Sequence, residues 1–362
     1  MSREGAIDTR KLFGLDQPYL LRSARKPFQA SSILRSPIGL PPTNPRSTEL
    51  QASFPPPLPP LFSPFPSSSP PVPTNSNTQS TQTAAFRFKL PKETYTFTFP
   101  NAPLPSAPTV GVDSIWNNVP KFYGWWPVSS SNISEIRTPH DHLEELLSSE
   151  EGPFDLVMCF SQGCTLLMSY ILYRYQEHML TRPSAGEKFE LPFKGAMFIC
   201  GGPSLHVLQD LGVDVTEKAW EVHHATAALL HKRTEQLKFK ADNPDTIKRG
   251  EGLWDEVGDL VHDPTSELDP EDVFGLDFTD ERMRMAVGNL GEIVPTVHVY
   301  GGKDPRWPAS VQLAQMFEGG MNERFDHGGG HELPRTTECS MRMAELMEKL
   351  RRKVDGLESE EQ

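Results

Sequence analysis

Three residues that lie far apart in the sequence, Ser161, Asp304 and His331, could together perform nucleophilic catalysis. A serine hydroxyl is a weak nucleophile that needs a neighbouring base, and that base needs a carboxylate to orient it. The chain order of serine, then aspartate, then histidine is one of the orders in which such triads occur. The sequence therefore predicts a nucleophile at Ser161, a general base at His331 and an orienting acid at Asp304.

The segment around the serine reads FDLVMCFSQGCTLL, residues 154–167. A hydrophobic strand passes directly through Ser161 into a helix, which is the context of a nucleophile elbow with its strained serine. Small residues two positions before and after the serine, Cys159 and Gly163, would let the strand and the helix approach closely. The backbone N–H of Gln162 would then sit at a helix N-terminus and donate to an oxyanion. The alternative is an ordinary buried turn with an incidental serine.

The acid and the base follow different patterns. Asp304 comes after the apolar run at 294–300 through Gly-Gly-Lys, which places a carboxylate at the carboxyl end of a predicted strand. His331 ends the run HGGGH, in which three glycines predict an irregular loop and deny His327 and His331 a shared helix face. A simple turn aspartate and a surface histidine remain the alternatives to catalytic roles.

No pattern in the sequence points to a cofactor or a metal ion. There is no phosphate-binding glycine loop, C-x-x-C pair or acidic cluster of the metal-binding kind. The four cysteines show neither metal-ligand nor disulfide spacing, so we expect reduced and mostly buried thiols in a reducing compartment. They are Cys159, Cys164, Cys200 and Cys339.

The elements that must position these residues follow from hydropathy. Three continuous apolar runs of strand length, at 154–160, 194–200 and 294–300, are separated by strongly helical patterns such as 162–180 and 336–350. Such strands are typical of a parallel sheet that is covered on both faces. Weaker patterns predict a strand at 95–99 and a short helix at 134–149.

About 90 residues, 203–292, separate the second and third apolar runs. This segment is charged, contains a helical stretch near 225–240, and is too long for a plain connection. We interpret it as a helical cap or lid over a site.

The N-terminal region differs in composition from the rest. Of the 35 prolines, 21 lie in the first 110 residues, and residues 55–73 read PPPLPPLFSPFPSSSPPVP. Such a tract cannot bury enough apolar area to fold, so we expect residues 1–85 to be disordered. PPPLPP could dock in a groove of the SH3 or WW type, or it could be a passive tail. The folded domain is then 86–354, followed by an acidic tail at 355–362.

Charge narrows the range of partners. The chain has a net charge of −13, and because residues 1–80 carry +4 the remainder carries −17. An acidic domain favours neither nucleic acid nor an anionic membrane surface. The apolar runs are too short to span a bilayer, and the N-terminus lacks the apolar core of a secretory signal. These features predict a protein that is not secreted and that is cytoplasmic or nuclear.

Taken together, these motifs resemble the fungal serine hydrolases of the FSH type, a branch of the α/β-hydrolase superfamily. The resemblance rests on GPFDLVMCFSQG, KGAMFICGG, VPTVHVYGGKDP and HGGGHELPR, and it covers roughly residues 85–354. It implies a mostly parallel, doubly wound α/β fold and the same roles for Ser161, His331 and Asp304. It also implies small to medium ester or thioester substrates. In filamentous fungi these include acyl chains carried on polyketide synthases.

One part of the family pattern is missing. The family begins with a strand that ends in a His-Gly-x-Gly type loop, which supplies the second oxyanion N–H, yet here no His-Gly occurs before residue 327. We therefore expect the first strand to be absent and an edge of the sheet to be exposed. Either the chain is a weakened or inactive relative that binds an acyl ligand or a protein, or residues 1–80 are translated non-coding sequence.

Overall fold

The computed structural model describes residues 18–23, 76–92, 94–106, 122–127, 132–149, 153–181, 188–246, 252, 254–264, 275–319 and 322–356. The chain divides into two compact units, and every described residue belongs to the unit formed by 1–24 and 67–362. The PPPLPP motif and the acidic tail beyond residue 356 lie outside the described residues.

Six strands form the main sheet, in the order β2-β1-β5-β6-β7-β8. The strands β5, β6, β7 and β8 run parallel, whereas β1 runs antiparallel to both of its neighbours. A second sheet pairs β3 with β4. The strands are β1 (Pro18–Ser23), β2 (Tyr95–Thr98), β3 (Leu104–Ser106), β4 (Phe122–Gly124), β5 (Leu156–Phe160), β6 (Gly195–Ile199), β7 (Thr296–Tyr300) and β8 (Asn322–Asp326).

Helices connect and cover these strands. They are α1 (Ser76–Arg87), α3 (Ile133–Leu147), α4 (Gln162–Leu180), α5 (Leu205–Asp210), α6 (Glu217–Asp242), the 3-10 turn η2 (Pro244–Thr246), α8 (Glu281–Val287), α9 (Leu290–Ile293), α10 (Trp307–Gln315) and α11 (Thr337–Val354). The predicted strands at 154–160, 194–200 and 294–300 and the predicted helices at 162–180 and 336–350 are confirmed.

The sheet is buried on both faces. Alternate side chains of a strand point to opposite faces, so Val157 and Phe198 join a core with α3 and α4. Their neighbours Met158 and Met197 join a second core with α11 on the other face. Because both faces of the sheet are shielded from solvent, every residue of β5 and β6 is buried. This burial explains why their sequences are continuously apolar. This is the doubly wound arrangement of the α/β-hydrolase fold.

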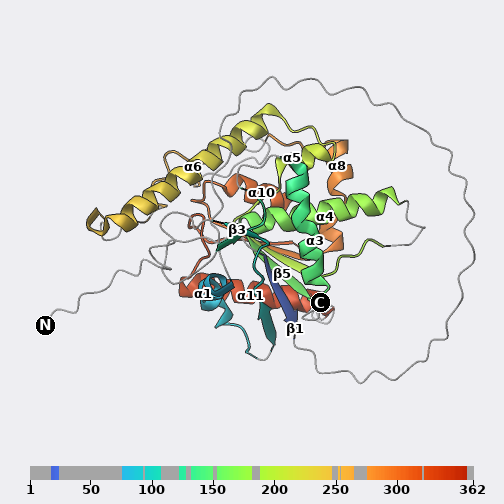
Figure 1. Cartoon of the computed structure of the whole chain (residues 1–362), viewed down its shortest axis with the longest axis horizontal. Coiled ribbons are helices and arrows are strands. Elements are labelled where there is room, and N and C mark those ends of the chain that lie inside the picture. The colour runs from blue at the N-terminus through green and yellow to red at the C-terminus, as the bar shows by residue number, and fades with distance from the viewer. Residues whose placement is uncertain are drawn as a thin grey trace, which may run out of the picture. The chain divides into compact units, whose positions relative to one another are not determined.

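Residues 203–292 connect β6 to β7 and carry α5, α6, α8 and α9, so the insert is helical. Its longest helix, α6, is drawn in yellow in Figure 1. Thr216 caps the start of α6 by accepting the backbone N–H of Ala219 at 3.1 Å. The helix is much longer than the stretch at 225–240 that its apolar pattern predicts.

The N-terminal region requires a correction. Strand β1 and most of helix α1 fall within residues 1–85, where the sequence shows no regular period. β1 lies between β2 and β5, so the expectation that a missing strand would leave an edge of the sheet exposed in this region was wrong. The strand is stabilised by its pairing with β2 and β5 rather than by its own pattern, which is why hydropathy does not reveal it.

Candidate active site

Ser161 is the single residue between the end of β5 and the start of α4. Its backbone has φ 50° and ψ −114°, a conformation that a residue with a side chain rarely adopts. Two hydrogen bonds hold the turn: the N–H of Ser161 donates to the carbonyl of Ile199 at 3.0 Å, and the N–H of Cys164 donates to the carbonyl of Ser161 at 3.0 Å. A strained serine between a strand and a helix is the local geometry of a nucleophile elbow.

The elbow is packed against the end of β6. A Cβ placed on Gly201 would lie 2.5 Å from Cys164 Cβ and 2.6 Å from the Ser161 carbonyl oxygen, so only glycine fits there. Cys159 and Gly163, the two residues predicted to let the strand and helix approach, are both buried. The Cys159 thiol lies 3.6 Å from the carbonyl of Met197 on β6.

The structure brings Ser161, His331 and Asp304 together in a continuous chain of hydrogen bonds. Ser161 Oγ lies 2.8 Å from His331 Nε2, and His331 Nδ1 lies 2.8 Å from Asp304 Oδ2. A carboxylate can only accept, so His331 donates its Nδ1–H to Asp304 and leaves Nε2 free to accept the serine hydroxyl proton. Asp304 is fully buried, which shields this hydrogen bond from competition with water.

Arg306 extends this chain, although sequence reasoning did not select it. Its backbone N–H donates to Asp304 Oδ1 at 2.7 Å, so both carboxylate oxygens have partners. Its guanidinium reaches α6 of the insert, where Nη1 donates to the carbonyl of His223 at 3.0 Å and to Thr226 Oγ1 at 2.8 Å. Burial lowers the pKa of the Arg306 guanidinium, and the nearby Asp304 charge opposes that shift. Only its place two residues after the acid could have drawn attention to it.

Asp326, at the end of β8, orders the two loops that carry Asp304 and His331. Its Oδ1 accepts the backbone N–H of Gly302 at 2.9 Å and that of Gly328 at 2.7 Å. No motif or hydropathy pattern points to Asp326, because only the parallel pairing of β7 with β8 brings these loops together. Burial lowers the pKa of the adjacent His327, and the carboxylates of Asp304 and Asp326 oppose that shift.

Gln162 is the first residue of α4, so its backbone belongs to the N-terminal turn of that helix. Partial positive charge at a helix N-terminus favours a developing oxyanion nearby. The Gln162 side chain is engaged elsewhere, since its Oε1 accepts the backbone N–H of Trp125 at 3.3 Å. Trp125 itself is fully buried, so this contact ties the start of α4 to a fixed loop.

The direction of β1 matters for the second oxyanion donor. In the family pattern, the first strand delivers its loop to the site from its carboxyl end. Here Pro18, at the start of β1, pairs with Cys159 near the nucleophile, while Leu21 pairs with Leu156 farther away. The carboxyl end of β1 therefore leads away from Ser161, and no loop of the His-Gly type follows it.

The described residues offer no resident metal site and no membrane-crossing segment. Across those ranges no group of three or more His, Cys, Asp or Glu side chains is arranged to hold a metal ion. None of the helices within them combines the length and the apolar character that a bilayer crossing requires. The four cysteines are free thiols, three of them buried, as predicted.

Curated proteins of fungal origin are similar to this chain. One is "Hydrolase FUB4" of Fusarium oxysporum f. sp. lycopersici, which is 28% identical over 231 residues, or 62% of this chain and 76% of that protein. Another is "Esterase FPY3" of Fusarium mangiferae, which is 25% identical over 281 residues, or 76% of this chain and 92% of that protein.

Among solved structures, carboxyl esterase 2 (TmelEST2) from the mycorrhizal fungus Tuber melanosporum aligns with a TM-score of 0.31. It shares 12% sequence identity, and the alignment covers 68% of this chain and 69% of that one. The family model described as "Serine hydrolase (FSH1)" matches residues 72–240 and 273–343. These two ranges make up more than half of the sequence and include Ser161, Asp304 and His331. The chain therefore belongs to the FSH1 family of serine hydrolases.

Proposed function

We propose that this protein hydrolyses carboxylic esters or thioesters through a triad of Ser161, His331 and Asp304. The observation that carries this proposal is the pair of 2.8 Å contacts that join the serine hydroxyl, the imidazole and the buried carboxylate. The strained backbone of Ser161 supports it independently, because such strain is kept where the surrounding structure enforces it.

In the acylation step, Ser161 Oγ attacks the carbonyl carbon of the substrate while His331 Nε2 takes the hydroxyl proton. The oxyanion that forms is stabilised at the start of α4 by the N–H of Gln162. Collapse of the tetrahedral intermediate breaks the bond to the alcohol or thiol, which leaves with the proton from His331. Asp304 keeps the Nδ1–H of His331 in place and stabilises the imidazolium while it carries both protons.

In the deacylation step, water replaces the leaving group. His331 Nε2 takes a proton from the water, whose oxygen attacks the acyl-enzyme carbonyl. Collapse of the second tetrahedral intermediate breaks the bond between the acyl carbon and Ser161 Oγ, which takes the proton back from His331, and the carboxylic acid is released. No cofactor enters this cycle.

The substrate class and its setting are further proposals. Relatives named as a hydrolase and an esterase support a small-molecule ester, and family resemblance supports a thioester such as a carrier-bound polyketide acyl chain. The acidic net charge supports a protein without nucleic-acid or anionic-membrane partners. The free thiols support a reducing compartment, which we propose is the cytoplasm or the nucleus.

The direct test is labelling of the purified full chain with a fluorophosphonate probe, alongside hydrolysis of p-nitrophenyl esters and an acyl thioester. We expect Ser161→Ala to abolish labelling and hydrolysis, while Ser148→Ala, at an exposed helix end, behaves as wild type. Labelling that persists in Ser161→Ala would contradict the assignment of the nucleophile.

A second candidate function is that of a weakened relative that binds an acyl ligand. The direction of β1 favours it, because β1 runs antiparallel to β5 and no His-Gly motif follows it in the sequence before residue 327. Loss of one such donor costs about 10² to 10³ in rate. A folded wild-type protein that is not labelled but binds a fatty acid in calorimetry would favour this candidate over the enzyme.

A further inference from the structure

Residues 254–264 form the part of the insert that approaches the loops of Asp304 and His331, and we refer to these residues as the brace. The indole of Trp254 is 9% exposed and lies directly against Gly330, the residue before His331. A Cβ on Gly330 would lie only 2.0 Å from Trp254 Cδ2. Gly330 does not have a positive φ, so the ring, rather than the backbone conformation, demands glycine at this position.

A second residue of the brace reaches the loop of the acid. His262 is buried, and its Nε2–H donates to the carbonyl of Gly302 at 2.7 Å, two residues before Asp304. Its ring also stacks on Trp307, with ring centroids 4.5 Å apart. Burial lowers the pKa of His262, so the ring is neutral near pH 7 and can serve as a donor. The brace thus touches the loops of both the acid and the base.

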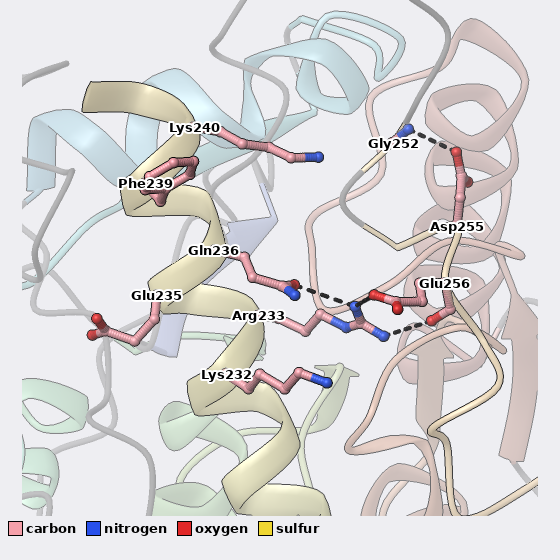
Figure 2. Close-up of a pocket in the computed structure, with 9 residues that line it drawn as sticks. All are labelled: Lys232, Arg233, Glu235, Gln236, Phe239, Lys240, Gly252, Asp255 and Glu256. Atoms are coloured by element: carbon pink, nitrogen blue, oxygen red, sulfur yellow. Dashed lines mark hydrogen bonds and ion pairs between the residues drawn. The ribbon is translucent and has the colours of Figure 1, made fainter. Parts of the chain in front are cut away.

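The brace is itself fixed to α6. Arg233 of α6 is 2% exposed, and its guanidinium bonds to Glu256 Oε2 and Asp259 Oδ1, each at 2.5 Å. Figure 2 shows the Arg233 side chain extending from α6 to Glu256 on the facing segment. A cavity of about 750 Å³ lies between α6 and this segment. The ion pairs of Arg233 therefore connect the brace to α6 beside a cavity rather than within a packed core.

From these contacts we infer that Trp254 and His262 are positioning residues that set where His331 and Asp304 meet. This role rests on the proposed triad. An error of about 1 Å in the placement of catalytic groups can cost about 10²-fold in rate. Loss of either contact should therefore lower kcat and leave KM nearly unchanged.

The first test is a double-mutant cycle on Trp254 and Gly330. We expect Trp254→Ala to lower kcat by about 10- to 10²-fold. Gly330→Ala alone should lower it at least as much, because its methyl group would collide with the indole. In the Trp254→Ala background the same methyl group has room, so the double variant should be as active as Trp254→Ala. Equal losses from Gly330→Ala in both backgrounds would overturn the inference.

The second test is specific to His262. His262→Phe keeps the stacking on Trp307 but removes the hydrogen-bond donor to Gly302. We therefore expect a lower kcat and a shift in the apparent pKa read from the pH profile of kcat/KM. The matched control is His231→Phe, at an exposed position of α6, which should change neither. Wild-type kcat and pH profile in His262→Phe would exclude a positioning role for this residue.

A spectroscopic readout separates failure of the brace from failure of the proposed function. The proton that His331 Nδ1 shares with Asp304 should give a low-field resonance, which Asp304→Asn removes whether or not the protein hydrolyses anything. We expect this resonance to shift or broaden in Trp254→Ala and His262→Phe and to stay unchanged in His231→Phe. An unchanged resonance in both brace variants would overturn the inference even if the wild type were inactive.

Discussion

The backbone N–H of Lys303 donates to the carbonyl oxygen of Gly329 at 2.9 Å. This hydrogen bond joins the residue before Asp304 to the loop that ends in His331. Because this bond holds the two loops together, the side chains of Asp304 and His331 lie within hydrogen-bonding distance of each other.

Substitution of Gly301 should separate the two loops. A Cβ at this position would lie 2.2 Å from the Gly329 carbonyl oxygen, and backbone atoms cannot move aside cheaply. We expect Gly301→Ala to lower kcat/KM by about 10²-fold or more in ester hydrolysis. Gly124→Ala is the matched control, because the nearest atom to its Cβ position is the Trp126 carbonyl oxygen at an ordinary 3.9 Å. Wild-type activity in Gly301→Ala would mean that the contact between the loops does not set the triad geometry.

Substitution of the acid should reduce activity without removing the nucleophile. An amide in place of the Asp304 carboxylate can hold the imidazole in the wrong tautomer, and it no longer stabilises the imidazolium. We expect Asp304→Asn to lower kcat by about 10⁴-fold at neutral pH. Steady-state ester hydrolysis measures this, with Asp277→Asn at an exposed turn of the insert as control. A loss below tenfold would argue against Asp304 as the orienting acid.

Thr226 of α6 should stabilise the fold through Arg306. Its hydroxyl accepts from Arg306 Nη1 at 2.8 Å and donates to the carbonyl of Val222 at 2.7 Å. Thr226→Val leaves a guanidinium N–H without its acceptor, so we expect the free energy of unfolding to fall by about 1–3 kcal/mol.

Urea denaturation would measure this loss, with Thr234→Val as the matched control. Thr234 also donates to a carbonyl one turn earlier in α6, at 3.0 Å, but has no contact with Arg306. Equal losses in the two variants would show that the interaction between Thr226 and Arg306 adds nothing to stability.

His298 should make the fold sensitive to acid. It is buried in β7 and stacked on Phe198, and burial lowers its pKa from 6.5 to about 3. Between about pH 3 and pH 6.5, the unfolded chain therefore binds a proton at His298 that the folded chain does not bind. The stability contributed by neutral His298 is complete above about pH 6.5 and decreases as the pH falls towards 3, by up to about 1.4 kcal/mol per pH unit. His140, with its pKa lowered by burial to about 4, acts in the same direction.

Urea denaturation at pH 7, 6 and 5 would test this dependence. We expect His298→Phe to have a shallower decline in unfolding free energy with acidification than the wild type, whatever its stability at pH 7. His231→Phe, which changes an exposed histidine, should retain the wild-type slope. An unchanged slope in His298→Phe would contradict a strongly lowered pKa.

Much of the fold and the candidate site could be predicted from the sequence. The apolar runs predicted β5, β6 and β7 because parallel strands that are buried on both faces consist mainly of apolar residues, with Thr296 and His298 as polar exceptions in β7. Ser161 could be identified because an elbow is local: strand, turn and helix are consecutive in the chain. Asp304 and His331 could be selected because they come after Ser161 in the order Ser, Asp, His and lie in glycine-rich turn and loop sequences.

Only the tertiary structure decided the rest. The pairing of β1 beside β5, the guanidinium of Arg306 beneath α6 and the indole of Trp254 against Gly330 join residues that are distant in sequence. Such contacts leave no period or motif, because each depends on how separate elements pack and not on the neighbours of a residue along the chain. The sequence determined which groups are available for catalysis, and the packing of the insert against two loops decided what holds them in place.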